Sequence, residues 1–429
     1  MHSVASLYFC TVIKNDATMI PTSSHPVSPA ERKRFRRIRL CMLLSGLSVF
    51  AQLYLFQPLL SDLCSFYGIS AVTGSLSVSA STIGMAFGLF VLAFKADAVS
   101  RGRLMGCSLI ASSLLRLLSV LAFNYPLLLL ANFLKGAVLA GVSAVALAYL
   151  TEEVDAAVIG LAISLYLSGN TLGGMAGRVS GTLLAGWADW HVAVLVIGAV
   201  SLLLGMIFVR LLPASRHFRP SVVSVRVKLG QMARLLGDRS FVGAYLIAAL
   251  SMGVFVSVYN YLSFLLESPA FGLPHYVVAG VFLMYTAGVA GSVLTGRLSD
   301  RYSPYTLLRG SLLLMVLGLL LLLVPRLESI VVGVGILTFA FFSTHTMASR
   351  IVSMQAREAR SSATSLYWLF YYTGSSLLGS VTGILLSDYG WPVFVAGLTV
   401  LVGVSFGVSC VALPVHRLAL RPVKHSINS

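Results

Sequence analysis

The sequence predicts an all-α membrane protein in which twelve transmembrane helices form two pseudo-symmetric six-helix bundles. Three observations support this fold class: an apolar composition, twelve long apolar runs, and a similarity between the two halves of the chain. Of 429 residues, 57% are hydrophobic and only 10% are charged, and the mean hydropathy is +0.90. Soluble globular domains carry about 25% charged residues. We therefore expect lipid, not water, to cover most of the surface.

The formal net charge of +16 would also suit a protein that binds nucleic acid. Such proteins cluster their basic residues on one folded face, whereas here these residues lie in short segments between apolar runs. That placement is typical of a membrane topology signal, so we expect no nucleic-acid partner. The five cysteines are scattered and match neither a disulfide framework nor a metal-ligand spacing, so we predict no metal site.

Twelve runs are long enough to cross a hydrocarbon core of about 30 Å, which takes about 20 apolar residues. They lie at 38–60, 72–94, 104–123, 126–150, 157–186, 190–212, 241–266, 276–297, 304–324, 328–350, 363–386 and 391–413. The runs predict an N-terminal bundle (38–212), a basic cytoplasmic linker (213–240) and a C-terminal bundle (241–413). Cytoplasmic tails at 1–37 and 414–429 complete the chain, and Met19 offers an alternative translation start. The tail at 1–37 does not resemble a signal peptide.

The basic residues between the spans fall almost entirely on one side of the membrane. They cluster at 32–39, 95–103, 210–239, 297–309, 350–360 and 417–424, and these clusters alternate with loops whose only basic residue is Arg326. Loops rich in Lys and Arg stay in the cytoplasm. We therefore predict that both termini are cytoplasmic.

The two halves of the sequence resemble each other at a spacing of about 200 residues. The sequence Ser-Leu-Tyr occurs at 164–166 and again at 365–367, and Trp190 before the sixth span corresponds to Trp391 before the twelfth. Transporters are often built from two such repeats, with the substrate site between them near the middle of the membrane.

Residues 296–301, Gly-Arg-Leu-Ser-Asp-Arg, resemble the G-x-L-x-D-R loop motif of the major facilitator superfamily. At the corresponding place after the second span, the motif is degraded. The resemblance implies gating roles for the motif residues that remain in the two copies, which are Asp97, Arg101, Gly296, Asp300 and Arg301.

The glycine spacing of the fifth span is similar to the antiporter motif of the same superfamily. Gly174 stands where that motif has proline, and Arg178 stands where it has its last glycine. Glycines let membrane helices approach closely, although generic small-residue packing would give a similar pattern. The resemblance implies that this helix lines the contact between the bundles, through Gly160, Gly169, Gly173, Gly174, Gly177 and Arg178.

Segments 149–153, 168–178 and 212–220 are similar to the bacterial YnfM-type subgroup, which is grouped with arabinose-like and drug efflux permeases. The resemblance covers roughly residues 38–420. It implies proton-coupled export of a small sugar-like or drug-like molecule from a bacterial cell inner membrane, by alternating access. We expect a monomer in the lipid bilayer that binds a small-molecule substrate. We expect no cofactor, with the proton gradient as the energy source, and no enzymatic activity.

Three cations lie within predicted spans: Arg116, Lys135 and Arg178. Unpaired cations at such depth are costly and are usually functional. Lys135 precedes Gly136 on a span that lines the cavity in the superfamily, so we predict that it is the cavity cation. Its structural alternative is a side chain that extends outward to the headgroups. Arg116 is on a peripheral span and suits a structural role, while Arg178 is expected to brace the bundle interface.

Aromatic and amide side chains in the spans suit a partly polar pocket for a hydroxyl-rich or mixed ligand. Besides Lys135, the candidates for the substrate cavity are Tyr54, Gln57, Tyr166, Asn170, Tyr259, Asn260, Tyr367 and Tyr371. No carboxylate lies near the centre of a predicted span, which leaves the proton-coupling group open. The coupling candidates are His345, because imidazole titrates near neutral pH, and the helix-end acids Asp62, Glu152 and Glu153. Instead of carrying a proton, His345 could be a hydrogen-bonded histidine of the packed core. Glu152 and Glu153 could lie in a solvated loop.

Three alternatives to an exporter remain. Three cations within spans that lack central carboxylates would suit an importer of a small organic anion. A membrane enzyme is less consistent with the sequence, which lacks H-E-x-x-H, G-x-S-x-G and P-loop patterns. A channel or receptor is also less consistent, because the two-fold repeat favours two halves that move.

Overall fold

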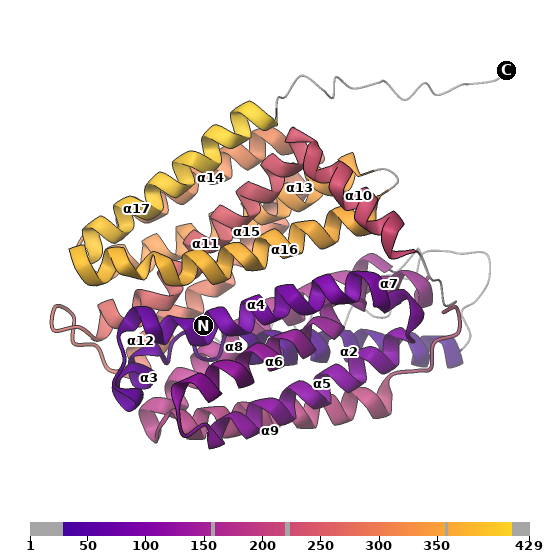
Figure 1. The fold of residues 1–429 in the computed structure, drawn as a ribbon, viewed down its shortest axis with the longest axis horizontal. Helices are drawn as coiled ribbons and strands as arrows, with labels where there is room; N and C mark the ends of the chain where they lie inside the picture. The colour runs from indigo at the N-terminus through magenta and orange to yellow at the C-terminus, as the bar shows by residue number, and fades with distance from the viewer. Residues whose placement is uncertain (1–28, 156–158, 219–223, 357–358, 414–429) are drawn as a thin grey trace.

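The chain folds into two helical bundles that lie side by side, as Figure 1 shows. The computed structural model describes residues 29–155, 159–218, 224–356 and 359–413. We call α2 to α9 the N-bundle and α11 to α17 the C-bundle. The end of the molecule that carries α3 and α12, on the left of Figure 1, is the outer end, because the loops there are those predicted to face outside.

The N-bundle consists of α2 (Pro29–Leu53), α3 (Leu60–Tyr67), α4 (Ala71–Lys95), α5 (Arg101–Leu118), α6 (Tyr125–Ser143), α7 (Ala146–Glu153), α8 (Ile159–Trp187) and α9 (Trp190–Leu211). Side chains cap several helix starts. Ser70, Asn124 and Asp189 each accept a hydrogen bond from the backbone N–H three residues later. Such caps satisfy N–H groups that the first turn leaves free, so these short polar segments end one span and begin the next.

The linker helix α10 (Val225–Gly237) leads into the C-bundle. That bundle consists of α11 (Arg239–Glu267), α12 (His275–Phe282), η4 (Leu283–Thr286), α13 (Ala287–Leu298), α14 (Pro304–Leu321), α15 (Leu327–Gln355), α16 (Arg360–Val381) and α17 (Gly383–Ala412). Gly390 has a φ of 80° inside α17. This left-handed conformation costs glycine little, and Pro392 follows it, so the break separates the eleventh span from the twelfth.

Nine helical stretches in the described residues are long and apolar enough to cross a membrane by themselves. α2, α8 and α16, with 25, 29 and 22 residues, complete the twelve spans. The fold class is therefore as predicted. These three helices are less apolar because they carry basic, glycine, serine and tyrosine residues, many of them buried inside the molecule.

Two predicted boundaries differ from the structure. α2 begins at Pro29, inside the predicted tail 1–37, because its basic first turns continue the helix beyond the apolar run. The predicted linker 213–240 contains α10 and the start of α11. The tail at 1–28 and the tail at 414–429 lie outside the described residues.

The glycine face of α8 packs against α2, within the N-bundle. A Cβ atom added to Gly173 would lie 2.6 Å from the Leu47 Cα, and one added to Gly177 would lie 2.6 Å from the Ala51 oxygen. Gly169 approaches the Leu43 backbone in the same way. These three glycines were expected to line the contact between the two bundles, but in this structure their close contacts are with α2 of their own bundle.

The other two glycines of this motif lie elsewhere. A Cβ added to Gly174 would lie 3.4 Å from Tyr285 of the C-bundle, while one added to Gly160 would meet no atom within 4 Å. α8 does line the bundle interface, where it packs against α12 and η4. It reaches the C-bundle through a face other than that of Gly169, Gly173 and Gly177.

Candidate functional site

The two bundles are joined by hydrogen bonds in the outer half of the molecule. Ser79 Oγ donates to the Ser376 oxygen (2.7 Å) and lies 2.7 Å from Ser380 Oγ, while Ser75 Oγ donates to the same Ser380 Oγ (2.9 Å). These residues belong to α4 and α16, near the outer end of each helix. The outer end is therefore closed in this structure.

Arg178 begins a second chain of hydrogen bonds that crosses between the bundles. Its Nε donates to Gln57 Oε1 (2.7 Å), and Gln57 Nε2 donates to Asn260 Oδ1 (2.8 Å). Asn260 Nδ2 in turn donates to the Gly379 oxygen (2.9 Å). The three side chains are fully buried. The chain thus links α8 and the turn after α2 to α11 and α16 of the C-bundle.

Three tyrosine rings surround the Arg178 guanidinium. Its carbon lies 4.7 Å from the ring centroid of Tyr54, 5.5 Å from that of Tyr259 and 4.5 Å from that of Tyr285. Ring faces stabilise a cation electrostatically, most of all where water is excluded. Within the described residues, Arg178 Nη2 has no hydrogen-bond partner. Nη2 of Arg178 is therefore available to donate a hydrogen bond to a substrate at the bundle interface.

A continuous run of rings leads from this cage into the C-bundle. Phe255 lies 5.9 Å from Tyr285 and stacks on Phe341 at 4.1 Å, between ring centroids. Phe341 lies 6.4 Å from Tyr371 and 6.3 Å from His345. We call this run, from Tyr285 to His345, the aromatic path.

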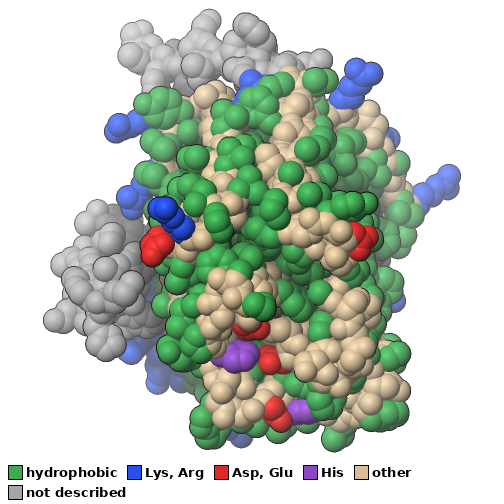
Figure 2. Space-filling model, turned by 90° about the vertical axis from the view of Figure 1, so that its left-hand side faces the viewer, with side chains coloured by type: hydrophobic (Ala, Val, Ile, Leu, Met, Phe, Trp, Pro, Cys, Tyr) green, Lys and Arg blue, Asp and Glu red, His purple; other side chains and the backbone are tan. Residues whose placement is uncertain are grey.

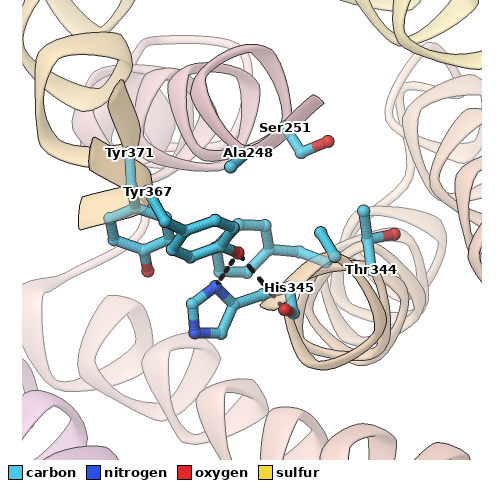
Figure 3. A pocket seen from close by; sticks show the side chains of 8 residues that line it. Ala248, Ser251, Thr344, His345, Tyr367 and Tyr371 are labelled. Carbon is cyan, nitrogen blue, oxygen red and sulfur yellow. Dashed lines mark hydrogen bonds between the residues drawn. The ribbon is translucent and has the colours of Figure 1, made fainter. Parts of the chain in front are cut away.

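The aromatic path ends at a narrow crevice, shown in Figure 3. It is lined by residues of α11, α15 and α16: Ala248, Ser251, Phe341, Thr344, His345, Ala348, Tyr367 and Tyr371. In this conformation the side chains fill the crevice and leave no room for a water molecule. A substrate would therefore enter only when the helices that line it move apart.

Tyr367 fixes the orientation of His345 in the crevice. Its hydroxyl donates to the His345 backbone oxygen (3.2 Å) and lies 2.8 Å from His345 Nδ1, and both contacts are drawn in Figure 3. One hydroxyl hydrogen serves one acceptor at a time, so both bonds form together only if Nδ1–H donates to the tyrosine oxygen. That tautomer leaves Nε2 as an acceptor for a substrate hydroxyl or amine.

Tyr367→Phe is expected to lower substrate affinity about two- to tenfold, because it frees the imidazole from this orientation. The range follows from about 0.5–1.5 kcal/mol for one hydrogen bond. The matched control is Tyr245→Phe on α11, whose buried hydroxyl has no hydrogen-bond partner in the described residues. Equal affinities of the two variants in a ligand-binding titration would exclude this role for Tyr367.

Lys135 and Arg116 lie inside the N-bundle, away from the crevice. The Lys135 ammonium donates to the Gln52 oxygen (3.1 Å), to Ser81 Oγ (3.0 Å) and to Asn132 Oδ1 (3.0 Å), which occupies its three N–H groups. Arg116 Nη2 donates to the same Gln52 oxygen (2.5 Å). Acceptors of its own bundle therefore hold the Lys135 ammonium in this conformation, and its role as the cavity cation stays a prediction. Neither cation extends to the lipid headgroups, since both are buried.

The remaining predicted cavity residues lie in three places: around Arg178, around His345 and beside Gly46 of α2. Tyr259 also bonds to Thr338 Oγ1 (2.8 Å), which fixes its ring within the cage around Arg178. The Asn170 side chain and the backbone oxygen of Tyr166 instead approach Gly46 of α2, within the N-bundle. The structure thus gathers Tyr54, Gln57, Tyr259 and Asn260 around Arg178, and Tyr367 and Tyr371 around His345.

Glu152 and Glu153 end helix α7, and the expectation of a solvated loop is wrong. The Glu153 side chain is fully buried and pairs with Arg34 (2.5 Å). It also accepts hydrogen bonds from the backbone N–H groups of 216–217 (2.8 and 3.0 Å). Glu152 pairs with Arg101 (3.1 Å) of the first loop motif. Both carboxylates are held in ion pairs because basic segments fold back onto α7, and their coupling role stays a prediction.

The second loop motif lies at the basic end of the C-bundle. Asp300 lies 3.5 Å from Arg350 of α15, while Arg301 is exposed and Gly296 borders open space. The side chain of Asp97 in the first motif lies outside the described residues. The gating roles of these residues stay predictions.

Sequence reasoning missed four residues of these sites: Tyr285, Phe255, Glu267 and His275. Tyr285 and Phe255 look like ordinary apolar residues of a span, and only the fold places them beside Arg178 and Phe341. Glu267 and His275 flank the short loop between the seventh and eighth spans. Their closeness in the sequence was a usable signal for a titratable pair at that end.

The chain resembles known transporters along most of its length. It is 33% identical to the uncharacterized MFS-type transporter YybF of Bacillus subtilis (strain 168), over 87% of this chain and 93% of that protein. It is 32% identical to the inner membrane transport protein YnfM of Escherichia coli (strain K12), over 83% of this chain and 86% of that protein. A chloramphenicol resistance protein of Streptomyces lividans is 26% identical, over 68% and 75% respectively.

A solved structure has the same fold. It is a bacterial homologue of the human lysosomal transporter Spinster in an inward-facing, unoccupied conformation, with a TM-score of 0.73 and 16% identity. The match covers 90% of this chain and 96% of that one. The family model described as Major Facilitator Superfamily matches residues 40–379 and 287–426. The chain is therefore a membrane transporter that belongs to the Major Facilitator Superfamily.

Proposed function

We propose that this transporter is a proton-driven exporter of small amphipathic molecules that works by alternating access. The observation that carries the proposal is the buried Arg178 cage, which lies where the two bundles meet and continues into the His345 crevice. A site formed jointly by both halves changes its exposure when the halves rock, as alternating access requires.

The chemistry of this site favours an aromatic, drug-like substrate over a sugar. The path consists of phenyl and phenol rings, whose faces and edges bind flat apolar groups. The crevice adds one imidazole, of His345, and four hydroxyls, of Ser251, Thr344, Tyr367 and Tyr371. Beside Arg178, the amides of Gln57 and Asn260 are already bonded to each other. Sugars need many polar partners for their hydroxyls. The resistance to chloramphenicol in the name of one relative supports a drug-like substrate.

We further infer that the transporter lies in a bacterial cell inner membrane with both termini in the cytoplasm. The distribution of basic residues supports this orientation, because Arg326 is the only basic residue in the predicted outer loops. Proton entry from the outside would then drive export. His345, Asp62, Glu152 and Glu153 are the candidates for the proton carrier.

Import of a small organic anion is the second candidate function. It is favoured by Arg178, whose contacts in the described residues are neutral groups and whose Nη2 has no partner. A buried cation without a carboxylate would attract an anionic ligand. The two functions differ in direction, so transport assays in inverted and right-side-out vesicles separate them.

The experiment is proton-driven uptake into inverted membrane vesicles. An exporter of aromatic compounds is expected to concentrate an aromatic probe when the vesicle lumen is acidic, and an importer is not. Uptake of an anionic probe only into right-side-out vesicles would contradict export and support the second function.

A further inference from the structure

At the outer end, titratable side chains from the two bundles meet. Ser61 Oγ of α3 donates to Glu267 Oε2 of α11 (2.7 Å), and Glu267 Oε1 lies 3.5 Å from His275 Nδ1 of α12. His275 also packs on α8, because a Cβ added to Gly186 would lie 2.7 Å from the Cβ of His275. Figure 2 looks onto this end and shows acidic and histidine side chains grouped among apolar ones.

Asp62 is the fourth side chain of this cluster, and like Glu267 Oε1 and His275 Nδ1 it has a buried polar atom without a hydrogen bond in the described residues. Its Oδ2 is buried and has no hydrogen-bond partner within the described residues. A buried carboxylate without a partner is costly when ionised. Asp62 follows the predicted span 38–60 and lies in α3, so the cluster forms at the mouth of the bundle interface.

The environment of Asp62 opposes its ionisation. Burial is the largest cause that raises its pKa, from 3.8 to about 6; the nearby His275 lowers the pKa and the nearby Glu267 raises it. A protonated Asp62 therefore fits the closed outer end better than an ionised one. When the bundles separate, Asp62 loses the neighbours of the other bundle and gains water, so its pKa returns toward the ordinary value.

The other titratable groups near the cluster either bond to partners outside it or are exposed. On α3, the Cys64 thiol bonds to the Ser70 oxygen (3.4 Å), and the Tyr67 hydroxyl donates to the Ala122 oxygen (2.7 Å). Between α8 and α9, Asp189 and His191 form a pair with each other (3.3 Å). On α12, Tyr276 is exposed, and the described start of α4 has no acidic residue.

We propose that Asp62, Glu267 and His275 form a proton-binding site that is assembled only when the outer end is closed. It rests on the alternating access of the proposed function, but not on the substrate or on the direction of transport. Closing brings the two carboxylates together, and a proton taken up at Asp62 relieves both the burial of its charge and its repulsion by Glu267.

The sign of the pH dependence follows from the raised pKa of Asp62 in the closed state. The protonated carboxyl favours closure fully below about pH 4, and this contribution is lost as the pH rises through about 6. A group with these two pKa values changes the ratio of closed to open molecules roughly tenfold between pH 5 and pH 8. Acid outside the cell would thus close the outer end.

The test measures the distance across the outer end at different pH values. Spin labels on unnatural amino acids at Phe123 and Ala270, both exposed and on opposite bundles, report whether the outer end is closed. Electron–electron resonance of the purified full-length chain in nanodiscs should show a short-distance population that dominates at pH 5. The ratio of short to long distances should fall roughly tenfold by pH 8.

Asp62→Asn is the test variant, because its uncharged amide resembles the protonated carboxyl of Asp62. It should keep the short distance dominant at pH 8 and remove most of the pH response. The matched control is Glu328→Gln, which removes an exposed acidic residue at the same end of the C-bundle and should leave the response intact. Distances that do not change with pH, or a full response in Asp62→Asn, would overturn the proposal. Because no transport is measured, either result is independent of whether the chain exports or imports.

Discussion

Arg178→Met is expected to reduce transport about ten- to a hundredfold while the protein still folds. The substitution removes the donor to Gln57 and the cation between three tyrosine rings. A hydrogen bond to a charged group contributes about 1.5–3 kcal/mol, which corresponds to this range of rates or affinities. The measurement is the initial transport rate in vesicles, normalised to the amount of protein.

Thermal stability separates this role from simple misfolding. A charge at the centre of a membrane helix costs about 2.5–3.5 kcal/mol on insertion scales. Methionine has a similar length and no charge, so the melting temperature of Arg178→Met should be unchanged or higher. Arg178→Lys keeps the charge but has no planar fork that reaches Gln57 and Gly174 together, so it should remain impaired. Normal transport by the methionine variant would show that the cage is only packing.

Gly173→Leu is expected to destabilise the N-bundle and lower the yield of folded protein. A Cβ at this position would lie 2.6 Å from the Leu47 Cα, and the contacting atoms belong to the backbone of α2. Overpacking a core costs about 1–3 kcal/mol, and rigid helix backbones cannot yield as a side chain would. The measurement is the melting temperature of the detergent-purified protein, together with its yield.

Gly160→Leu is the matched control on the same helix. A Cβ there would meet no atom within 4 Å, so this variant should fold as the unmodified chain does. If Gly173→Leu melts and expresses like Gly160→Leu, the close packing of α8 on α2 does not exist in the membrane. If it folds normally but transports nothing, the motif acts between the bundles, as the sequence resemblance first implied.

The fold was predictable because its signals are local. Apolar length and the placement of basic residues are read one segment at a time. Arg178 was also predictable as a bundle-interface residue, because it stands at the last glycine position of the antiporter-like motif on the fifth span.

The direction of individual side chains was not predictable, because it depends on which face of a helix meets which partner. Lys135 and Arg178 look equivalent in the sequence, as lone cations at similar depth. The structure turns Lys135 into its own bundle, where Gln52, Ser81 and Asn132 offer acceptors, and turns Arg178 toward the C-bundle. Only Asn132, three residues earlier on the same helix, follows from helix spacing; Gln52 and Ser81 belong to two other helices and become neighbours of Lys135 only in the fold.

The central claim is that a proton gradient moves a small aromatic molecule through the Arg178 cage. The most direct measurement uses inverted vesicles loaded at acid pH, diluted into neutral buffer, with labelled chloramphenicol, arabinose and benzoate as separate probes. We expect that chloramphenicol accumulates, that a protonophore abolishes the accumulation, and that Arg178→Met vesicles accumulate it about ten- to a hundredfold more slowly. Accumulation of chloramphenicol that does not depend on the proton gradient would contradict this proposal, and so would accumulation of arabinose or benzoate alone.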